Sequence, residues 1–97
     1  MIVNERQTEE GLLVSVCDPD VMGKTFEDGA VSLTVSEEFY GGEHREEDEV
    51  LDSLRRATVA NIVGKRSVDV AVEAGFIDED AVLDIEGTLH AQLLRLG

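Results

Sequence analysis

The stretch EEDEVLDSLRRATVANIVGKRSVDVAVEAG, residues 46–75, decides the predicted fold. Its first four residues are acidic. Negative charge is favourable at the N-terminus of a helix because it interacts with the positive end of the helix macrodipole. At about 100° per residue, one buried stripe then forms from Val50, Leu51, Leu54, Ala57, Thr58, Asn61 and Ile62. This spacing predicts a helix from residue 46 to about residue 62 that Gly64 ends in a left-handed cap.

A second helix is predicted directly after the first. Ser67 is a suitable N-cap, and apolar residues fill nearly every position from Val68 to Ala74, so this helix should be deeply packed. Asn61 is the exceptional residue of the first helix, because an amide in an apolar stripe needs a hydrogen-bond partner. We expect Asn61 to latch a neighbouring loop, such as residues 39–42, or to face a partner.

Strand patterns lie on both sides of this stretch. Residues 2–6 and 12–17 flank a turn sequence ending in Gly11 and predict a hairpin, which Asp18-Pro19-Asp20 ends. Residues 24–28 are expected to form a loop or single helical turn anchored by Phe26, and alternation over residues 31–35 predicts a third strand. Residues 82–85 and 89–96 flank Glu86-Gly87 and predict a closing hairpin.

These elements predict a small α+β fold in one domain over residues 1–97. A mostly antiparallel sheet of about five strands would carry two consecutive helices on one face. Consecutive helices leave no regular alternation of strand and helix, and no glycine-rich phosphate loop follows any predicted strand. A doubly wound nucleotide-binding fold is therefore not expected.

The composition indicates the solvent in which the protein works. The chain has 22 acidic and 8 basic residues, a net charge of −14, and such self-repulsion requires concentrated counterions. We interpret this as a protein of a salt-accumulating cell; the alternative is an acidic protein of an ordinary cell. The start of the chain lacks a signal-peptide pattern, no apolar run could span a membrane, and Cys17 is the single cysteine. A reducing cytoplasm is expected, with no metal or cofactor.

Basic residues form the first candidate site. Arg55, Arg56, Lys65 and Arg66 hold half of the positive charge at the predicted junction of the two helices. Guanidinium groups and free N–H groups at a helix N-terminus suit phosphate oxygens. The alternative is that these cations complement a helix C-terminus and pair with nearby acids.

Two further constellations involve titratable residues. His90 and Gln92 share one face of a strand, where His90 could act as an acid or base or stack on a nucleobase; alternatively, His90 is a half-buried structural residue. Cys17 and Asp18 end a predicted strand, where a reactive thiolate would need a neighbouring cation. The alternative is a buried structural cysteine beside a turn-forming aspartate.

Several short motifs occur in an order that resembles a known family. They are residues 16–18, 22–24 with Phe26 and Gly29, 39–42 including Tyr40, 60–64, 75–78 and 90–92. Together they resemble the archaeal domain-of-unknown-function family 424 over essentially the whole chain. Leu89 departs from the family pattern, in which proline often precedes the histidine. The resemblance implies a small archaeal protein without an assigned activity, and a link to translation.

Three functional hypotheses follow. The leading one is a non-enzymatic module that binds RNA or a ribosome-associated protein, with phosphate contacts from the four cations and base or partner contacts from His90 and Gln92. Asn61, Gly64, Asp18, Cys17 and Tyr40 would shape the site. The second is a small enzyme with His90 as acid or base, helped by Asp18 or Cys17. The third is a symmetric oligomer. No membrane or DNA signature is present, and the oligomeric state is left open.

Overall fold

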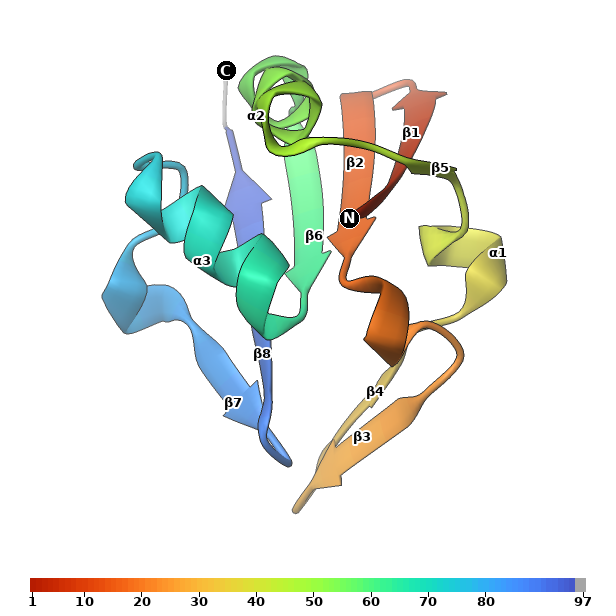
Figure 1. Cartoon of the computed structure of the whole chain (residues 1–97), viewed down its shortest axis with the longest axis vertical. Helices are drawn as coiled ribbons and strands as arrows, with labels where there is room; N and C mark the ends of the chain where they lie inside the picture. The colour runs from red at the N-terminus through yellow and green to blue at the C-terminus, as the bar shows by residue number, and fades with distance from the viewer. Residues whose placement is uncertain (96–97) are drawn as a thin grey trace.

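The computed structural model describes residues 1–95. Figure 1 shows helices α2 and α3 in front of a twisted sheet, with the small β3–β4 hairpin at the end remote from α2. The elements in chain order are β1 (Ile2–Thr8), β2 (Gly11–Cys17), the 3-10 turn η1 (Pro19–Val21), β3 (Thr25–Asp28), β4 (Val31–Thr34), α1 (Glu37–Tyr40), β5 (Glu43–His44), α2 (Glu47–Arg56), β6 (Val59–Val63), α3 (Lys65–Glu73), the 3-10 turn η2 (Glu79–Ala81), β7 (Leu83–Ile85) and β8 (Thr88–Leu94).

The main sheet has six strands in the order β5-β1-β2-β6-β8-β7. All neighbouring strands are antiparallel except β2 and β6, which run parallel. The α+β class, the mostly antiparallel sheet and the two helices on one face are therefore confirmed. Within residues 1–95, no helix has both the length and the apolar character needed to cross a lipid bilayer.

The predicted N-terminal hairpin is confirmed. Thr8 pairs with Gly11, so Glu9 and Glu10 form a two-residue connection. Gly11 has a φ of 125°, and a side chain there would overlap the Thr58 hydroxyl. The glycine therefore serves both the backbone conformation of the turn and a close approach to the segment that precedes β6.

The prediction of one helix from residue 46 to about residue 62 was wrong beyond Arg56. Helix α2 ends there, and residues 59–63 form β6 between β2 and β8. The segment after Ala57 is rich in β-branched residues, which favour strands, and it gains main-chain hydrogen bonds from a strand on each side. Arg95 stabilises the helix end, because its Nη1 donates to the carbonyls of Leu54, Arg55 and Ala57.

The second helix also begins differently from the prediction. Strand β6 separates α2 from α3, so the two helices are not consecutive in the chain. Gly64 is the N-cap of α3 rather than the end of the preceding helix, and Ser67 lies inside the first turn of α3. The deep packing of α3 is confirmed, since Ser67, Val68, Val70 and Ala71 are buried.

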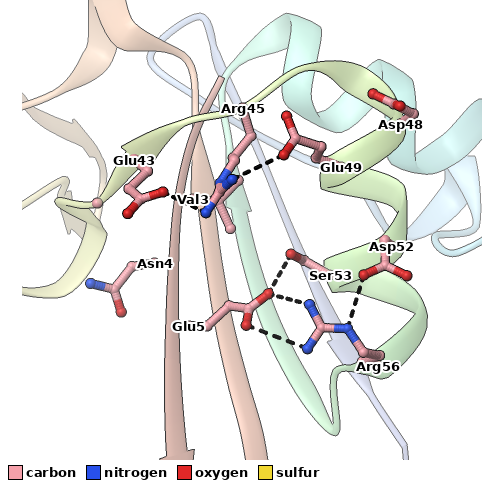
Figure 2. A pocket seen from close by; sticks show the side chains of 11 residues that line it. Val3, Asn4, Glu5, Glu43, Arg45, Asp48, Glu49, Asp52, Ser53 and Arg56 are labelled. Carbon is pink, nitrogen blue, oxygen red and sulfur yellow. Dashed lines mark hydrogen bonds and ion pairs between the residues drawn. The ribbon is translucent and has the colours of Figure 1, made fainter.

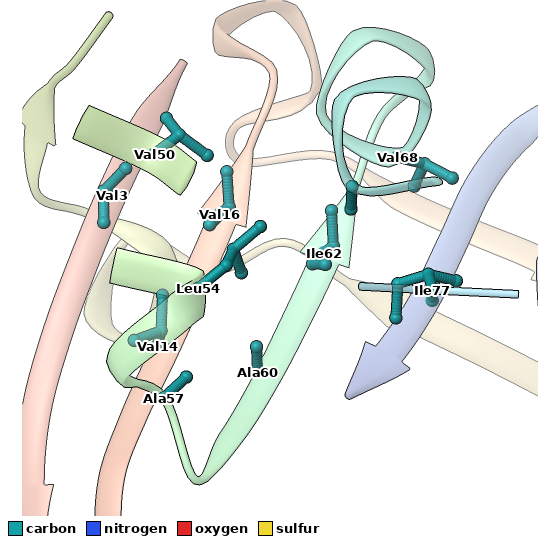
Figure 3. Close-up of a cluster of buried hydrophobic side chains, with 12 residues drawn as sticks. Val3, Val14, Val16, Val50, Leu54, Ala57, Ala60, Ile62, Val68 and Ile77 are labelled. Atoms are coloured by element: carbon teal, nitrogen blue, oxygen red, sulfur yellow. The ribbon is translucent and has the colours of Figure 1, made fainter. Parts of the chain in front are cut away.

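The larger hydrophobic core lies between the sheet and the two helices (Figure 3). Alternate residues of the central strands point toward α2 and α3, as the period of two in a strand requires. Completely buried members of this core are Val14, Val16, Val50, Leu54, Ala60, Ile62 and Ala71. The core residues of β2 and β6 therefore face the helices, and the residues between them face the opposite side of the sheet.

A second cluster covers one end of the opposite face. It joins Ile2, Cys17 and Val63 of the sheet to Val35 and Tyr40. The predicted loop or helical turn at residues 24–28 is instead strand β3, which pairs with β4 in a separate hairpin. Phe26 packs against the cluster as its expected anchor. The strand predicted at residues 31–35 forms as β4 over residues 31–34, but does not join the main sheet.

The closing hairpin is confirmed as β7–β8. Glu86 and Gly87 connect the strands with φ values of 55° and 87°, the left-handed pair that a tight hairpin turn requires. Asp84 Oδ1 accepts from the N–H of Gly87 at 2.8 Å and holds this turn. Strand β8 ends at Leu94, and residue 96 of the predicted strand lies outside the described residues.

Candidate functional site

The sheet face opposite the helices is left uncovered beyond the second cluster. Register partners on four adjacent strands form a polar row across this face, made of Asn4, Ser15, Asn61 and Gln92. Ser15 is buried, Asn4 and Asn61 are half-buried, and only Gln92 is exposed. Gln92 Nε2 donates to Asn61 Oδ1 at 2.9 Å, and Gln92 is exposed. The Asn61 amide nitrogen and the Gln92 amide oxygen have no hydrogen-bond partner among residues 1–95. One donor and one acceptor are thus available to a binding partner.

The position of Asn61 corrects its prediction. It lies in β6 rather than in a helix, it is half-buried, and its partner is the side chain of Gln92 rather than the loop at residues 39–42. That loop is instead held by Asn4, whose Nδ2 donates to the carbonyl of Gly41 at 2.5 Å.

An apolar row lies next to the polar row. It joins Leu13, Val59 and Leu94 across β2, β6 and β8, and Arg6 of β1 extends it. Leu94 is 63% exposed, more than any other large apolar side chain in residues 1–95. A mostly apolar cavity of about 270 Å³ lies at the end of the row, against Leu13, Val59 and Gly11. Leu13 and Val59 are half-buried, so the row is a partly exposed apolar strip that ends in exposed Leu94, and interaction surfaces contain strips of this kind.

His90 shares the uncovered face with Gln92, as predicted, while Ala91 between them is buried in the main core. The histidine is half-buried and pairs in register with Val63 and Leu83. Its Nδ1 is buried and has no hydrogen-bond partner among residues 1–95. Burial lowers the pKa of His90, because the charged ring loses hydration. The neutral imidazole is therefore favoured at neutral pH.

The four basic residues do not form one cluster. Arg55 and Arg56 end α2 before β6, whereas Lys65 and Arg66 begin α3 after it, so the length of this five-residue strand, roughly 16 Å, separates the two pairs. Arg55 lies 3.6 Å from Asp52, Arg56 bonds Glu5 and Asp52, and Lys65 lies 3.0 Å from Asp69. Arg66 has no ion pair among residues 1–95.

The N-terminus of α3 is occupied by a carboxylate of the chain itself. Asp18 Oδ2 accepts from the backbone N–H of Arg66 at 3.0 Å, and Oδ1 accepts from the Ser67 N–H at 2.9 Å and the Ser67 hydroxyl at 2.7 Å. Gly64 has a φ of 112°, and a side chain there would overlap the Asp18 carboxylate. Two of the N–H groups that the sequence suggested for phosphate, those of Arg66 and Ser67, are therefore already bonded.

Cys17 and Tyr40 belong to the second hydrophobic cluster. Burial, reinforced by the neighbouring Asp18 carboxylate, raises the pKa of the Cys17 thiol to about 11. Burial likewise raises the pKa of Tyr40 to about 12, and its ring meets Phe39 edge-on at 5.2 Å. Cys17 and His90 are each paired with Val63 from opposite sides, so two strand spacings, roughly 10 Å, separate them. The geometry does not bring the thiol and imidazole together.

Sequence reasoning missed two features of the site. The apolar row was not recognised, although Leu13 and Val59 alternate with core residues and could have indicated a strand with apolar side chains on both faces. Arg95 was also missed; besides capping α2, its guanidinium lies 5.6 Å from the centre of the Phe76 ring. No local pattern marks this role, because the contacted carbonyls lie some forty residues away in the chain.

Together, the fold and the uncovered face define a small α+β protein that presents paired amides beside an apolar row. The chain belongs to the family described as protein of unknown function (DUF424), whose model matches residues 5–96. The crystal structure of an uncharacterized conserved protein from Methanopyrus kandleri is similar, with 25% identity and a TM-score of 0.78 over 99% of this chain and 94% of that chain. No curated protein sequence matched the chain.

Proposed function

We propose that the protein is a non-enzymatic binding module that associates with a ribonucleoprotein of the translation apparatus through the uncovered face of its sheet. The observation that carries this proposal is the exposed Asn61–Gln92 amide pair beside the apolar row of Leu13, Val59 and Leu94. Amides offer directional donors and acceptors, and the apolar row offers surface to bury. This combination suits recognition by shape and hydrogen bonding.

The charge distribution supports this mode of binding over general attraction to phosphate. A net charge of −14 opposes a polyanion, and the cations at the two ends of β6 are mostly paired with acids. At about 1 M salt, however, the Debye length is only about 3 Å, so the overall charge does not prevent close contacts. The acidic composition supports a salt-accumulating cell as the setting, and the similar Methanopyrus protein supports an archaeal one.

The decisive experiment is a pull-down of the tagged protein at physiological salt, with and without ribonuclease, followed by mass spectrometry and RNA sequencing. Asn61→Ala/Gln92→Ala should reduce recovery of the partner, and Leu94→Asp should abolish it, because each removes part of the proposed contact surface. Val31→Asp is the matched control: Val31 is 49% exposed on β4, in the separate hairpin at the end of the molecule remote from α2 (Figure 1). Wild-type protein that recovers neither ribosomal components nor RNA would overturn the proposal.

A second set of variants tests the basic residues. Replacing Arg55, Arg56, Lys65 and Arg66 by Gln should flatten the salt dependence of association if they bind phosphates, because each phosphate of a duplex that is no longer neutralised removes close to one unit of slope. Ribonuclease separates the two routes of association. Recovery that survives ribonuclease indicates contact with a ribosomal protein, and recovery that disappears indicates contact with RNA. Unchanged salt dependence in the folded quadruple variant would remove these four residues from the interface.

A further inference from the structure

The outer edge of β1 is open along most of its length. Strand β5 pairs only with Ile2 and Val3, and no other strand lies on that side of β1 within residues 1–95. Thr8 and Gly11 close the hairpin, so even-numbered residues of β1 bond β2 and odd-numbered residues direct their N–H and C=O groups outward. The bond from the Arg45 N–H to the Met1 carbonyl, 2.8 Å long, confirms this alternation.

Glu5 and Gln7 are therefore the residues whose main-chain groups point to the open edge. Both are exposed, and neither has a strand partner on that side within residues 1–95. Two donors and two acceptors are available there, in the spacing that an added strand needs. The opposite side of the same strand is fully paired with β2.

A polar cavity of about 630 Å³ adjoins this edge (Figure 2). The cavity lies between β1, the β5 segment and α2, on the face of the sheet that carries the helices. A side chain of an added strand that points toward this face would therefore enter the cavity. Five of its lining residues are acidic: Glu5, Glu43, Asp48, Glu49 and Asp52. Two are basic, Arg45 and Arg56, which leaves a formal charge of −3 for the lining (five negative, two positive).

The two arginines hold the walls of this cavity together. Arg45 bridges Glu43 and Glu49, the latter at 2.9 Å, and Arg56 bridges Glu5 and Asp52 at 2.5 and 3.0 Å. Hydrogen bonds from Arg56 and Ser53 lower the pKa of Glu5, so its carboxylate stays charged. Asp48, which also lines the cavity, has no ion pair among residues 1–95. Ion pairs thus hold the cavity walls in place, while the lining keeps an excess of negative charge.

We propose that the open edge of β1 binds an extended basic segment of a partner protein, which adds a strand beside Glu5 and Gln7 and places alternate Lys or Arg side chains in the acidic cavity. Main-chain hydrogen bonds would supply affinity, and the acidic cavity would supply selectivity for basic side chains. Charge decides against the other occupants of such an edge. A second copy of this chain paired through the same edge would place its own acidic cavity lining against this one, and a nucleic acid would place phosphates there. Both would bring like charges into direct contact, where salt screens least.

This inference goes beyond the proposed function, because it concerns a different surface and does not depend on the uncovered sheet face. Basic extended arms are common in proteins that bind nucleic acid. An acidic chain that associates with a ribonucleoprotein would meet such arms there. The edge would then bind a protein component while the sheet face makes the contacts proposed above.

The test uses a fluorescent peptide of about twelve residues that alternates Lys and Thr, the length that spans the edge and cavity with overhang. A control peptide of the same sequence carries N-methyl groups on every backbone nitrogen, which removes the donors of both strand edges without changing the charge. Binding is measured by fluorescence anisotropy at the lowest KCl concentration at which circular dichroism shows the protein fully folded. The methylated peptide should bind about tenfold more weakly, since the missing main-chain bonds contribute about 1.4 kcal/mol.

Variants of the protein test the same contacts from the other side. Gln7→Pro removes an outward N–H without touching the bonds to β2 and should weaken binding about tenfold. Asp48→Asn/Asp52→Asn should weaken it roughly five- to tenfold, because two negative charges facing the basic peptide are removed. Glu73→Gln/Glu79→Gln is the matched control, because it removes two acids near the α3 and β7 end of the molecule. It should change affinity less than about twofold.

Three results would overturn the proposal. Equal binding of the two peptides would show that charge alone attracts them, because the peptides differ only in their main-chain donors. The proposed main-chain hydrogen bonds would then not form. Equal weakening by the control pair and by Asp48→Asn/Asp52→Asn would place the peptide elsewhere. Sedimentation that shows a dimer abolished by Gln7→Pro would make a second copy the occupant. If Gln7→Pro destabilises the fold, the methylated peptide still decides, and wild-type amide exchange provides a second measure: the Glu5 and Gln7 amides should become protected on binding.

Discussion

Asp18, Gly64 and the start of α3 form a contact whose strength can be tested by a double-mutant cycle. The Asp18 carboxylate accepts three hydrogen bonds at the N-terminus of α3, two of them from buried Ser67, and is itself only 8% exposed. Asp18→Ala leaves those donors buried and removes a helix cap, so it should lower the free energy of unfolding by about 3 kcal/mol. Asp18→Asn should lower it by about half as much, because one accepting oxygen remains.

Gly64→Ala acts on the same contact from the other side. The backbone at a φ of 112° is strained for any residue with a side chain, by about 1–3 kcal/mol, and the added methyl group also displaces the carboxylate. We therefore expect a decrease of about 4–6 kcal/mol in the wild-type background. With Asp18→Ala already present, the overlap with Cγ and Oδ2 is gone, but the backbone strain and a close contact with the Cβ of residue 18, at 2.7 Å, remain. The two substitutions should therefore couple by about 2 kcal/mol.

Urea unfolding followed by circular dichroism, in molar KCl to keep every variant folded, measures all four corners of this cycle. Additivity within about 0.5 kcal/mol would refute the reasoning, because it would mean that the alanine at position 64 and the Asp18 carboxylate do not compete for space. Gly75→Ala is a suitable control. Gly75 also has a positive φ, 83°, but a side chain there meets no neighbour, so only backbone strain should appear.

Three other predictions follow from charge, burial and position. The melting temperature should rise between 0.1 and roughly 2 M KCl, because salt screens the net charge of −14; a flat or falling curve would contradict the halophilic interpretation. Asn61→Ala should change the free energy of unfolding by less than about 1 kcal/mol, because its one side-chain partner is exposed Gln92. A decrease of about 2 kcal/mol or more in urea unfolding would contradict the assignment of Asn61 and Gln92 as an exposed pair. His90 should contribute to acid sensitivity: burial lowers its folded pKa below the ordinary 6.5, so its contribution is complete above pH 6.5 and declines as pH falls through the lowered value. His90→Gln should reduce the slope of stability against pH in that window, and an unchanged slope would show that the imidazole is equally hydrated in both states.

The two terminal hairpins could be predicted from the sequence because their signals are local. Residues that favour strands, on both sides of a turn sequence, identify β1 and β2, and a period of two identifies β8. Gly11 and Gly87 occupy turn positions with positive φ. The start of α2 was equally clear, since its first turn is acidic and complements the helix macrodipole. In the structure Glu49 also accepts from the Glu46 N–H there. Neither assignment needed information from distant parts of the chain.

The end of α2 could not be predicted in the same way. Residues 57–63 fit a helical stripe as well as a strand, and no glycine or proline separates Leu51 from Val63. Placement of this segment between β2 and β8 decides the matter, because both neighbours supply main-chain partners. The misassigned helix also gave Asn61 the wrong environment and joined the four cations into a cluster that β6 in fact divides.

The sequence by itself determined the α+β class, the acidic character, the hairpins and the shared face of His90 and Gln92, since each depends on composition or on spacing within a few residues. Tertiary structure alone decided the rest. Asp18 meets Ser67 across forty-nine positions, Gln92 meets Asn61 across thirty-one, and Arg56 meets Glu5 across fifty-one. Side chains so far apart are brought together only by the order of the strands in the sheet, which no local pattern specifies.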